Sequence, residues 1–359
     1  MNIEFEAIEN IDKNIAIAIS YNINAVFKVN MLSGECEYIG TVPNEKLEAK
    51  RLYVKAIKAR GKIYFIPYTA KGIAVYDIEK KYIYKIELND KIKEYQQENK
   101  NNKYFSDGVV YNKHLFIIPC MCPVILRLNT ENDTIDYYDD WVRDREFVFR
   151  KDLEVDGNYI YAASCINNLV LQFDMEKCKG NLMSIGNNNG SWGICKVKNS
   201  LWISPQGEGA IIEWNKKNGQ INEYNDYPYG FKGNDFLFTK IYNINDEIYV
   251  IPAHANMGVK IDCNTHKIEK FNIDALDDIN VTLFMFELDK YIYLKRVGNE
   301  VNYIRINKDN NVVDKYNFYI KNNDELKMDV IYKTLNEDEI IKESKLVQLE
   351  DFIDFIKVK

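Results

Sequence analysis

Few side chains in this chain form a combination that could carry out catalysis. Glu208 and His254 fall on corresponding loops of adjacent repeats (defined below), and an acid–histidine pair of this kind could act in general acid–base chemistry. The other two histidines, His114 and His266, fall at a predicted strand start and at a turn. No phosphate-binding loop, nucleophile elbow or H-E-x-x-H metal motif occurs. The sequence therefore leaves catalysis undecided and favours a non-catalytic role.

A second group of residues combines aromatic rings with positive charges. Such a group could stack on a sugar ring or a base and hold a carboxylate or phosphate in arginine forks. In the alternative, the rings fill the junctions between structural units and the charges are solvated. With three polar loop residues added, the predicted ligand-binding set is Tyr68, Trp141, Arg143, Arg145, Arg150, Trp192, Gln206, Tyr229, Lys232 and Asn256.

The cysteines do not indicate a metal site. Cys120, Cys122 and Cys165 fall on corresponding loops of adjacent repeats, but a C-x-C pair without a fourth ligand is a weak metal motif. Buried thiols with a packing role are the favoured interpretation. Because the seven cysteines are odd in number and lack a framework spacing, we expect reduced thiols. No metal and no cofactor are predicted.

Charge and hydropathy exclude some classes of partner. The 359 residues carry a net charge of −7, whereas a general nucleic-acid binder needs a basic face. No apolar run approaches the roughly 18 residues needed to cross a bilayer. The acidic start, Met1 to Glu6, lacks the features of a signal peptide. We expect a cytoplasmic protein, and the richness in Asn, Lys, Ile and Tyr suits a bacterial AT-rich genome.

A repeated motif organises most of the chain. An Asn or Asp recurs at intervals of 41 to 52 residues, each time preceded by apolar residues one and three positions earlier. This alternation predicts a strand with one buried face, and the Asx side chain can start a tight turn after it. The seven positions are Asn30, Asp77, Asn129, Asp174, Asn215, Asp262 and Asn307.

A second marker lies ten residues before six of these turns, where an apolar stretch ends in proline or serine: Ser20, Pro67, Pro119, Ser164, Pro205 and Pro252. With a further apolar stretch on either side, each repeat holds four strands. Four-stranded units of this length predict an all-β fold, a seven-bladed β-propeller of antiparallel blades. A sandwich or a solenoid is the alternative, but neither requires these fixed offsets. Residues 3–9 can supply the first innermost strand, so the ring could close without a C-terminal strand.

One repeat resembles a known family. Gly193-Ile194, Leu201 to Ser204 and Gly219 to Tyr224 are similar to one blade of the streptogramin-lyase-like propellers, the virginiamycin B lyase group. That resemblance implies the blade fold. The lyases open a ring ester with histidines and a bound metal, whereas the three histidines here come from different repeats. The resemblance therefore implies no lyase activity.

The repeat also divides the chain and places its loops. Residues 1–320 are the predicted propeller, and 321–359 are a C-terminal extension with an amphipathic helix at about 345–357. That helix either packs on the propeller or docks a partner. Loops between blades, and between second and third strands, share one face, which is the expected site. We predict a binding propeller for a protein or small polar ligand there; a lyase or hydrolase acting on a glycan, peptide or cyclic metabolite is the alternative.

Overall fold

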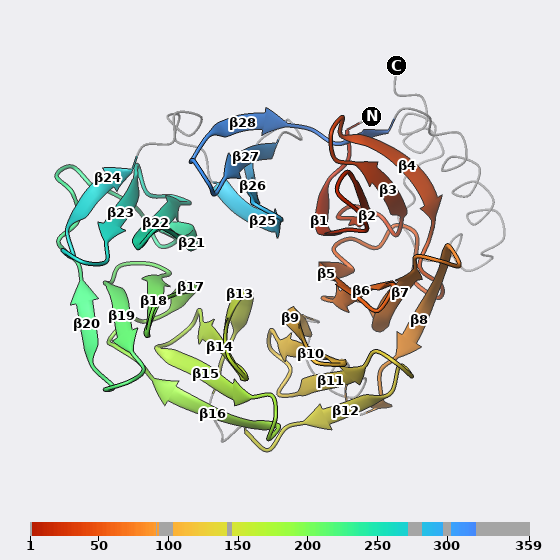
Figure 1. The fold of residues 1–359 in the computed structure, drawn as a ribbon, viewed down its shortest axis with the longest axis horizontal. Coiled ribbons are helices and arrows are strands. Elements are labelled where there is room, and N and C mark those ends of the chain that lie inside the picture. The colour runs from red at the N-terminus through yellow and green to blue at the C-terminus, as the bar shows by residue number, and fades with distance from the viewer. Residues whose placement is uncertain are drawn as a thin grey trace, which may run out of the picture.

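Seven antiparallel sheets stand around a central axis in a computed structural model of the chain (Figure 1). The structure describes residues 2–90, 92, 103–141, 146–271, 282–296 and 303–320. Blades 1 to 3 contain β1 (Phe5–Asn10), β2 (Ile15–Ser20), β3 (Val26–Asn30), β4 (Glu35–Gly40); β5 (Tyr53–Ala59), β6 (Lys62–Pro67), β7 (Gly72–Asp77), β8 (Tyr82–Glu87); β9 (Phe105–Tyr111), β10 (His114–Pro119), β11 (Ile125–Asn129) and β12 (Ile135–Tyr138).

Blades 4 to 7 repeat the same order of strands from the axis outward. They contain β13 (Phe149–Asp156), β14 (Tyr159–Ser164), β15 (Leu169–Asp174), β16 (Lys179–Ser184); β17 (Ser191–Val197), β18 (Ser200–Pro205), β19 (Ile211–Asn215), β20 (Ile221–Tyr224); β21 (Phe238–Ile244), β22 (Glu247–Pro252), β23 (Gly258–Asp262), β24 (Ile268–Phe271); β25 (Thr282–Leu288), β26 (Tyr291–Arg296), β27 (Tyr303–Asn307) and β28 (Val313–Tyr316). The protein is therefore a seven-bladed β-propeller, as predicted.

The Asx motif forms the turn after the third strand of each blade. In blade 1, Asn30 Oδ1 accepts hydrogen bonds from the N–H groups of Leu32 and Ser33. Asn129, Asp174, Asn215, Asp262 and Asn307 also accept from the residue two positions on, while Asp77 accepts from Lys80. These short bonds end the strand and start the return to the outermost one. The predicted alternation and turn are confirmed.

Both ends of the described part of the chain join blade 1. The N-terminal strand β1 is the innermost strand of that blade, as predicted. In addition, the short strand β29 (Tyr319–Ile320) pairs in parallel with β4, and Phe318 is buried in the same hydrophobic cluster as Phe5. Closure thus uses a C-terminal strand that the sequence pattern did not call for. The predicted helix at 345–357 lies outside the described residues.

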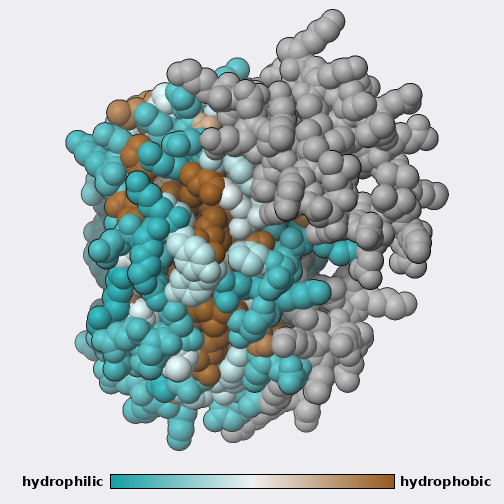
Figure 2. Space-filling model, turned by 90° about the vertical axis from the view of Figure 1, so that its right-hand side faces the viewer, coloured by the Kyte–Doolittle hydropathy of each residue, from teal (hydrophilic) through white to brown (hydrophobic). Residues whose placement is uncertain are grey.

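On the side of the ring where β4 and β8 lie, the described outer surface is mostly hydrophilic (Figure 2). Figure 2 views the side where β4 and β8 lie, and apolar residues form a narrow band between hydrophilic ones. Ile83 and Ile86 of β8 are half-buried, whereas Tyr82 is 58% exposed. Outermost strands bury only one face, which explains this mixture. Within the described ranges, no helix is long and apolar enough to span a membrane.

Candidate functional site

Every innermost strand carries a β-bulge near its first residue. In blade 2, Tyr53 pairs with Pro67 and Lys55 with Ile66, which leaves Val54 as the extra residue. The residue before the bulge pairs with the strand-ending Ser or Pro in six blades. A proline there has no N–H to donate, which suits an interrupted ladder. The extra residues are Glu6, Val54, Ser106, the stretch 150–152, Trp192, Thr239 and Met285.

Blade 4 has a longer bulge than the others. Phe149 pairs with Ser164 and Leu153 with Ala162, so three residues of β13 face one of β14. Asp152, the last of the three, has a φ of 148°, a backbone conformation that residues other than glycine rarely adopt. The longer bulge brings two consecutive basic residues, Arg150 and Lys151, to the axis. Bulges that re-aim side chains in this way are frequent beside functional sites.

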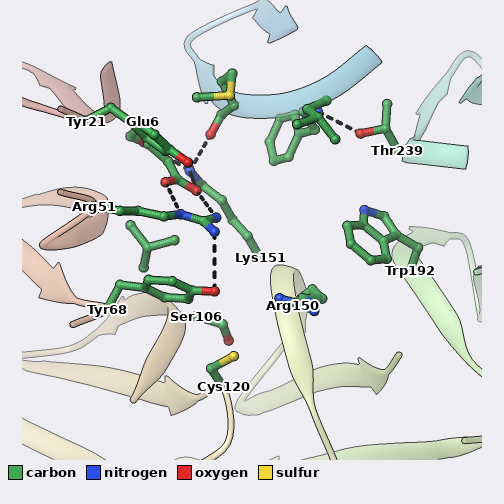
Figure 3. A pocket seen from close by; sticks show the side chains of 14 residues that line it. Glu6, Tyr21, Arg51, Tyr68, Ser106, Cys120, Arg150, Lys151, Trp192 and Thr239 are labelled. Carbon is green, nitrogen blue, oxygen red and sulfur yellow. Dashed lines mark hydrogen bonds and ion pairs between the residues drawn. The ribbon is translucent and has the colours of Figure 1, made fainter. Parts of the chain in front are cut away.

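The bulged residues line a cavity at the end of the central channel. Its volume is about 190 Å³, and all seven blades contribute to its wall (Figure 3). Most of the remaining lining follows a second strand or precedes a bulge. The full lining is Glu6, Tyr21, Arg51, Val54, Tyr68, Ser106, Cys120, Arg150, Lys151, Trp192, Thr239, Leu283, Phe284 and Met285. The loop face predicted as the site is thus the face where this cavity opens.

A hydrogen-bonded network occupies one side of the cavity. Arg51 donates from Nε and Nη2 to the two carboxylate oxygens of Glu6, each at 2.7 Å, and from Nη1 to the Tyr68 hydroxyl at 3.3 Å (Figure 3). Arg51 has a left-handed φ of 51°, and its N–H donates to the Tyr21 carbonyl. Its guanidinium also lies 4.3 Å from the Tyr68 ring centre. The surroundings therefore hold Arg51 in a strained backbone conformation.

Lys151 completes this network from blade 4. Its ammonium donates to the carbonyl oxygens of Glu6 and Met285 and lies 3.9 Å from the Glu6 carboxylate. Burial lowers the pKa of Lys151 to about 8; the Glu6 and Asp107 carboxylates oppose this shift. Lys151 is therefore positively charged at neutral pH and close to its titration point.

Arg150 and Trp192 form the opposite side of the cavity. The Arg150 guanidinium carbon lies 5.4 Å from the Trp192 ring centre, within cation–π range. Its Nε is buried and has no hydrogen-bond partner. The thiols of Cys165 and Cys120 are the titratable groups with the largest effects on the pKa of Arg150, Cys165 also through a side-chain hydrogen bond, and no described carboxylate lies within ion-pair distance of it. Trp192 in turn packs on Phe236 at 4.1 Å between ring centres.

Three of the ten predicted binding residues line the cavity: Tyr68, Arg150 and Trp192. Trp141 instead is buried between blades 3 and 4, where it packs on Phe147 and donates from Nε1 to the Tyr138 carbonyl. Trp141 thus fills a junction between two blades, which is the alternative that the sequence left open for these aromatic rings. Arg143 and Arg145 lie outside the described residues.

The other predicted residues lie around the rim. Gln206 is half-buried, and its Oε1 has no hydrogen-bond partner. Asn256 pins the loop between β20 and β21: its Oδ1 accepts from Lys232 N–H, and its Nδ2 donates to the Gly230 carbonyl. This loop presents Tyr229 fully to solvent. None of these four side chains is part of the cavity lining.

The possible catalytic and metal-binding residues do not meet in the cavity. Glu208 is exposed, His254 packs edge-on against Phe236, and no ion pair joins the two. Cys120 lines the cavity, but burial raises the pKa of its thiol to about 11, which makes it a poor nucleophile. Within the described part of the chain, no group of three or more His, Cys, Asp or Glu side chains is arranged to hold a metal ion.

Several cavity residues escaped the sequence prediction, above all Glu6, Arg51 and Lys151. A signal for some of them was present in the repeat. The bulged residue lies twenty-three positions before the Asx in five repeats, counting Lys151 for blade 4, and twenty-two or twenty-four before it in the other two. Extending the repeat register upstream would have found Lys151 and come within one position of Glu6. Arg51 lies in an inter-blade loop and has no such marker.

Comparison with solved structures gives the same fold class. The chain is similar to catalytically inactive virginiamycin B lyase from Staphylococcus aureus with quinupristin, with a TM-score of 0.59, 16% identity, and coverage of 82% of this chain and 92% of that chain. BamB from Moraxella catarrhalis matches with a TM-score of 0.55 and 13% identity, over 80% of each chain.

A third similar structure is YCF48 bound to D1 peptide, with a TM-score of 0.56, 10% identity, and coverage of 90% of this chain and 94% of that chain. At these identities the likeness shows the fold alone. No family model and no curated protein matches the sequence. The chain is thus a seven-bladed propeller whose structural neighbours include a lyase and a protein bound to a peptide.

Proposed function

We propose that this chain is a binding propeller that takes a small polar ligand in the axial cavity. The observation that carries the proposal is the convergence of bulged residues from all seven blades on one cavity of about 190 Å³. A preformed concave site with a few fixed polar groups is the usual form of a small-ligand site. The Glu6–Arg51–Tyr68 network supplies such groups in a fixed geometry.

The cavity favours binding over catalysis. Its one carboxylate, Glu6, is held by both prongs of Arg51, and the Lys151 ammonium already donates to two backbone carbonyls. Neither group is therefore placed to exchange a proton with a ligand. The predicted acid–histidine pair, Glu208 and His254, lies outside the lining. A protein partner bound by the rim, with Tyr229 as its exposed aromatic contact, is the competing form of the proposal.

A thermal-shift screen tests the proposal with two matched variants. Metabolite-sized sugars, amino acids, organic acids, nucleobases and amines are added to the full-length protein. A ligand that binds only the folded state raises the melting temperature. Val54→Phe puts a larger side chain into the cavity wall, whereas Val312→Phe makes the same change at an exposed turn. Circular dichroism first establishes that both variants fold.

We expect some compounds to stabilise the native protein and Val312→Phe but not Val54→Phe. If no compound stabilises the native protein, or if the stabilisation persists in Val54→Phe, the cavity is not the ligand site.

A further inference from the structure

We infer that the ligand of the axial cavity is an organic anion, a carboxylate or phosphate ester on a flat, largely apolar body, and that Arg150 captures its charged end. This inference rests on the proposed function and adds the chemical class of the ligand. Three independent features carry it: the charge balance of the lining, the absence of a carboxylate partner for Arg150 among the described residues, and the aromatic and aliphatic remainder of the wall.

The cavity is positively charged inside a negatively charged protein. Its lining contains three basic side chains, Arg51, Arg150 and Lys151, and one carboxylate, Glu6. The whole chain carries a net charge of −7. Glu6 accepts both prongs of Arg51, so it does not neutralise Arg150. A low-dielectric pocket with excess positive charge favours a negatively charged ligand.

Arg150 differs from the other basic residues of the innermost strands. Lys55 pairs with Asp107, Lys196 with Asp156, and Lys240 with Asp152 and Glu287. Arg150 has no described carboxylate partner, and its buried Nε donates to no atom of the protein. Arg150 is half-buried, and its titratable neighbours are the thiols of Cys165 and Cys120, not a carboxylate. Partial burial of a charge without an ionic partner is unfavourable, and an arginine does not relieve that cost by losing its proton. An anion bound in the cavity would satisfy this charge.

The backbone of blade 4 indicates that this placement serves a purpose. The β13 bulge has one more extra residue than the other bulges. This longer bulge brings both Arg150 and Lys151 to the axis, and it leaves Asp152 with φ of 148°. Such backbone conformations are energetically unfavourable and cluster at functional sites. The bulges of the other six innermost strands contain only one extra residue each, so closure of the ring does not require the longer bulge of β13.

The rest of the wall suits a flat apolar body. Trp192, Tyr68 and Phe284 contribute rings, and Val54, Leu283 and Met285 contribute aliphatic surface. Arg150 and Trp192 lie together on one side, so an anion held by the guanidinium would place an attached ring near the indole (Figure 3). A cavity of about 150 Å³ is known to hold benzene. The volume of about 190 Å³ accommodates one such ring with a charged substituent.

Isothermal titration of the full-length protein with three probes tests the inference. Benzoate and benzamide have nearly the same shape and differ in charge, and phenyl phosphate distinguishes a phosphate from a carboxylate. Charge-assisted hydrogen bonds are stronger than neutral ones, so at least one of the two anions should bind about tenfold or more tightly than benzamide. The tighter of the two anions identifies the head group.

Arg150→Gln should remove this preference, so that the two anions and benzamide bind with similar affinity. Arg127→Gln is the matched control. The substitution removes the same charge, but Arg127 pairs with Asp136 on the outer part of blade 3, away from the cavity. If Arg150→Gln does not fold, a salt titration of the native protein replaces it: added sodium chloride should weaken anion binding and leave benzamide binding unchanged.

Two results would overturn the inference and leave the proposed function standing. In the first, benzamide binds as tightly as both anions, or only neutral and cationic compounds stabilise the protein in the thermal-shift screen. In the second, the preference for anions persists in Arg150→Gln, which would remove Arg150 from the site. A screen without any stabilising compound would instead count against the proposed function itself.

Discussion

Arg51 and Glu6 form a two-pronged ion pair between the loop that enters blade 2 and the innermost strand of blade 1, with both N–O distances at 2.7 Å. The Glu6 side chain is 4% exposed and that of Arg51 is 35% exposed. The pair therefore connects two neighbouring blades at the wall of the cavity. Because Glu6 also faces Lys151 from blade 4, one carboxylate organises basic residues from two sides.

Glu6→Gln should destabilise the protein by about 1–3 kcal/mol, since it leaves Arg51 and Lys151 facing each other without a carboxylate. The partial exposure of Arg51 keeps the expected loss below that of a fully buried pair. Urea unfolding measures the change. Glu37→Gln is the control, because its pair with Lys28 is solvent-exposed and should contribute little. Equal losses in the two variants would contradict a structural role for the Glu6 network.

Lys151 should make stability depend on pH in an alkaline window. Burial lowers its pKa to about 8, and the charges of Arg51 and Lys55 add to this lowering while Glu6 and Asp107 oppose it. An unfolded lysine titrates near 10.4. Between these values the unfolded state binds more protons, so deprotonation of native Lys151 stabilises the fold as the pH rises.

The measurement compares the native protein with Lys151→Met by urea unfolding at pH 7, 8, 9 and 10. The native protein should gain stability relative to the variant above pH 8, and the difference should be constant below pH 7. A constant difference across the whole range would mean that Lys151 titrates normally.

Trp141→Ala should cost about 3–5 kcal/mol of stability without changing the affinity for a cavity ligand. The ring is 3% exposed, packs on Phe147 and Phe149, and leaves no room at Gly180, where a Cβ atom would lie 2.6 Å from the Trp141 Cβ. Chemical unfolding and titration of the same sample separate the two effects. A folded variant with weakened ligand binding would restore Trp141 to the binding set.

Two glycines test the closure of the ring. Gly34 and Gly61 have nearly equal φ values of 78° and 75°, so alanine is strained equally at both. At Gly34, however, a new Cβ would lie 2.0 Å from the Asn317 carbonyl oxygen, just before β29, whereas nothing lies within 4 Å of that atom at Gly61. Gly34→Ala should therefore cost about 1–3 kcal/mol more than Gly61→Ala in urea unfolding. Equal costs would show that β29 does not hold blade 1 closed.

From the sequence, we could predict which face of the propeller carries the candidate site but not which residues of that face line the cavity. The repeat register correctly sent Tyr68, Arg150 and Trp192 to the face where the cavity opens. It did not separate them from Tyr229 or Asn256, because loops on one face look alike in sequence whether they reach the axis or the rim. Aromatic residues add to this ambiguity, since Trp141 and Trp192 were both assigned to loops between blades and only Trp141 is buried at a blade junction.

The sequence by itself determined the blades, their number and the Asx turns, because strand alternation and turn chemistry depend on neighbours a few residues apart. Tertiary structure alone decided which side chains meet. The bulges turn Glu6, Lys151 and Trp192 toward a common axis only after seven sheets close into a ring, and the approach of Glu6 to Arg51 and Lys151 spans 45 and 145 residues of chain. Contacts of that range follow from the curvature of the whole assembly and from the docking of β29 on β4, which no local pattern records.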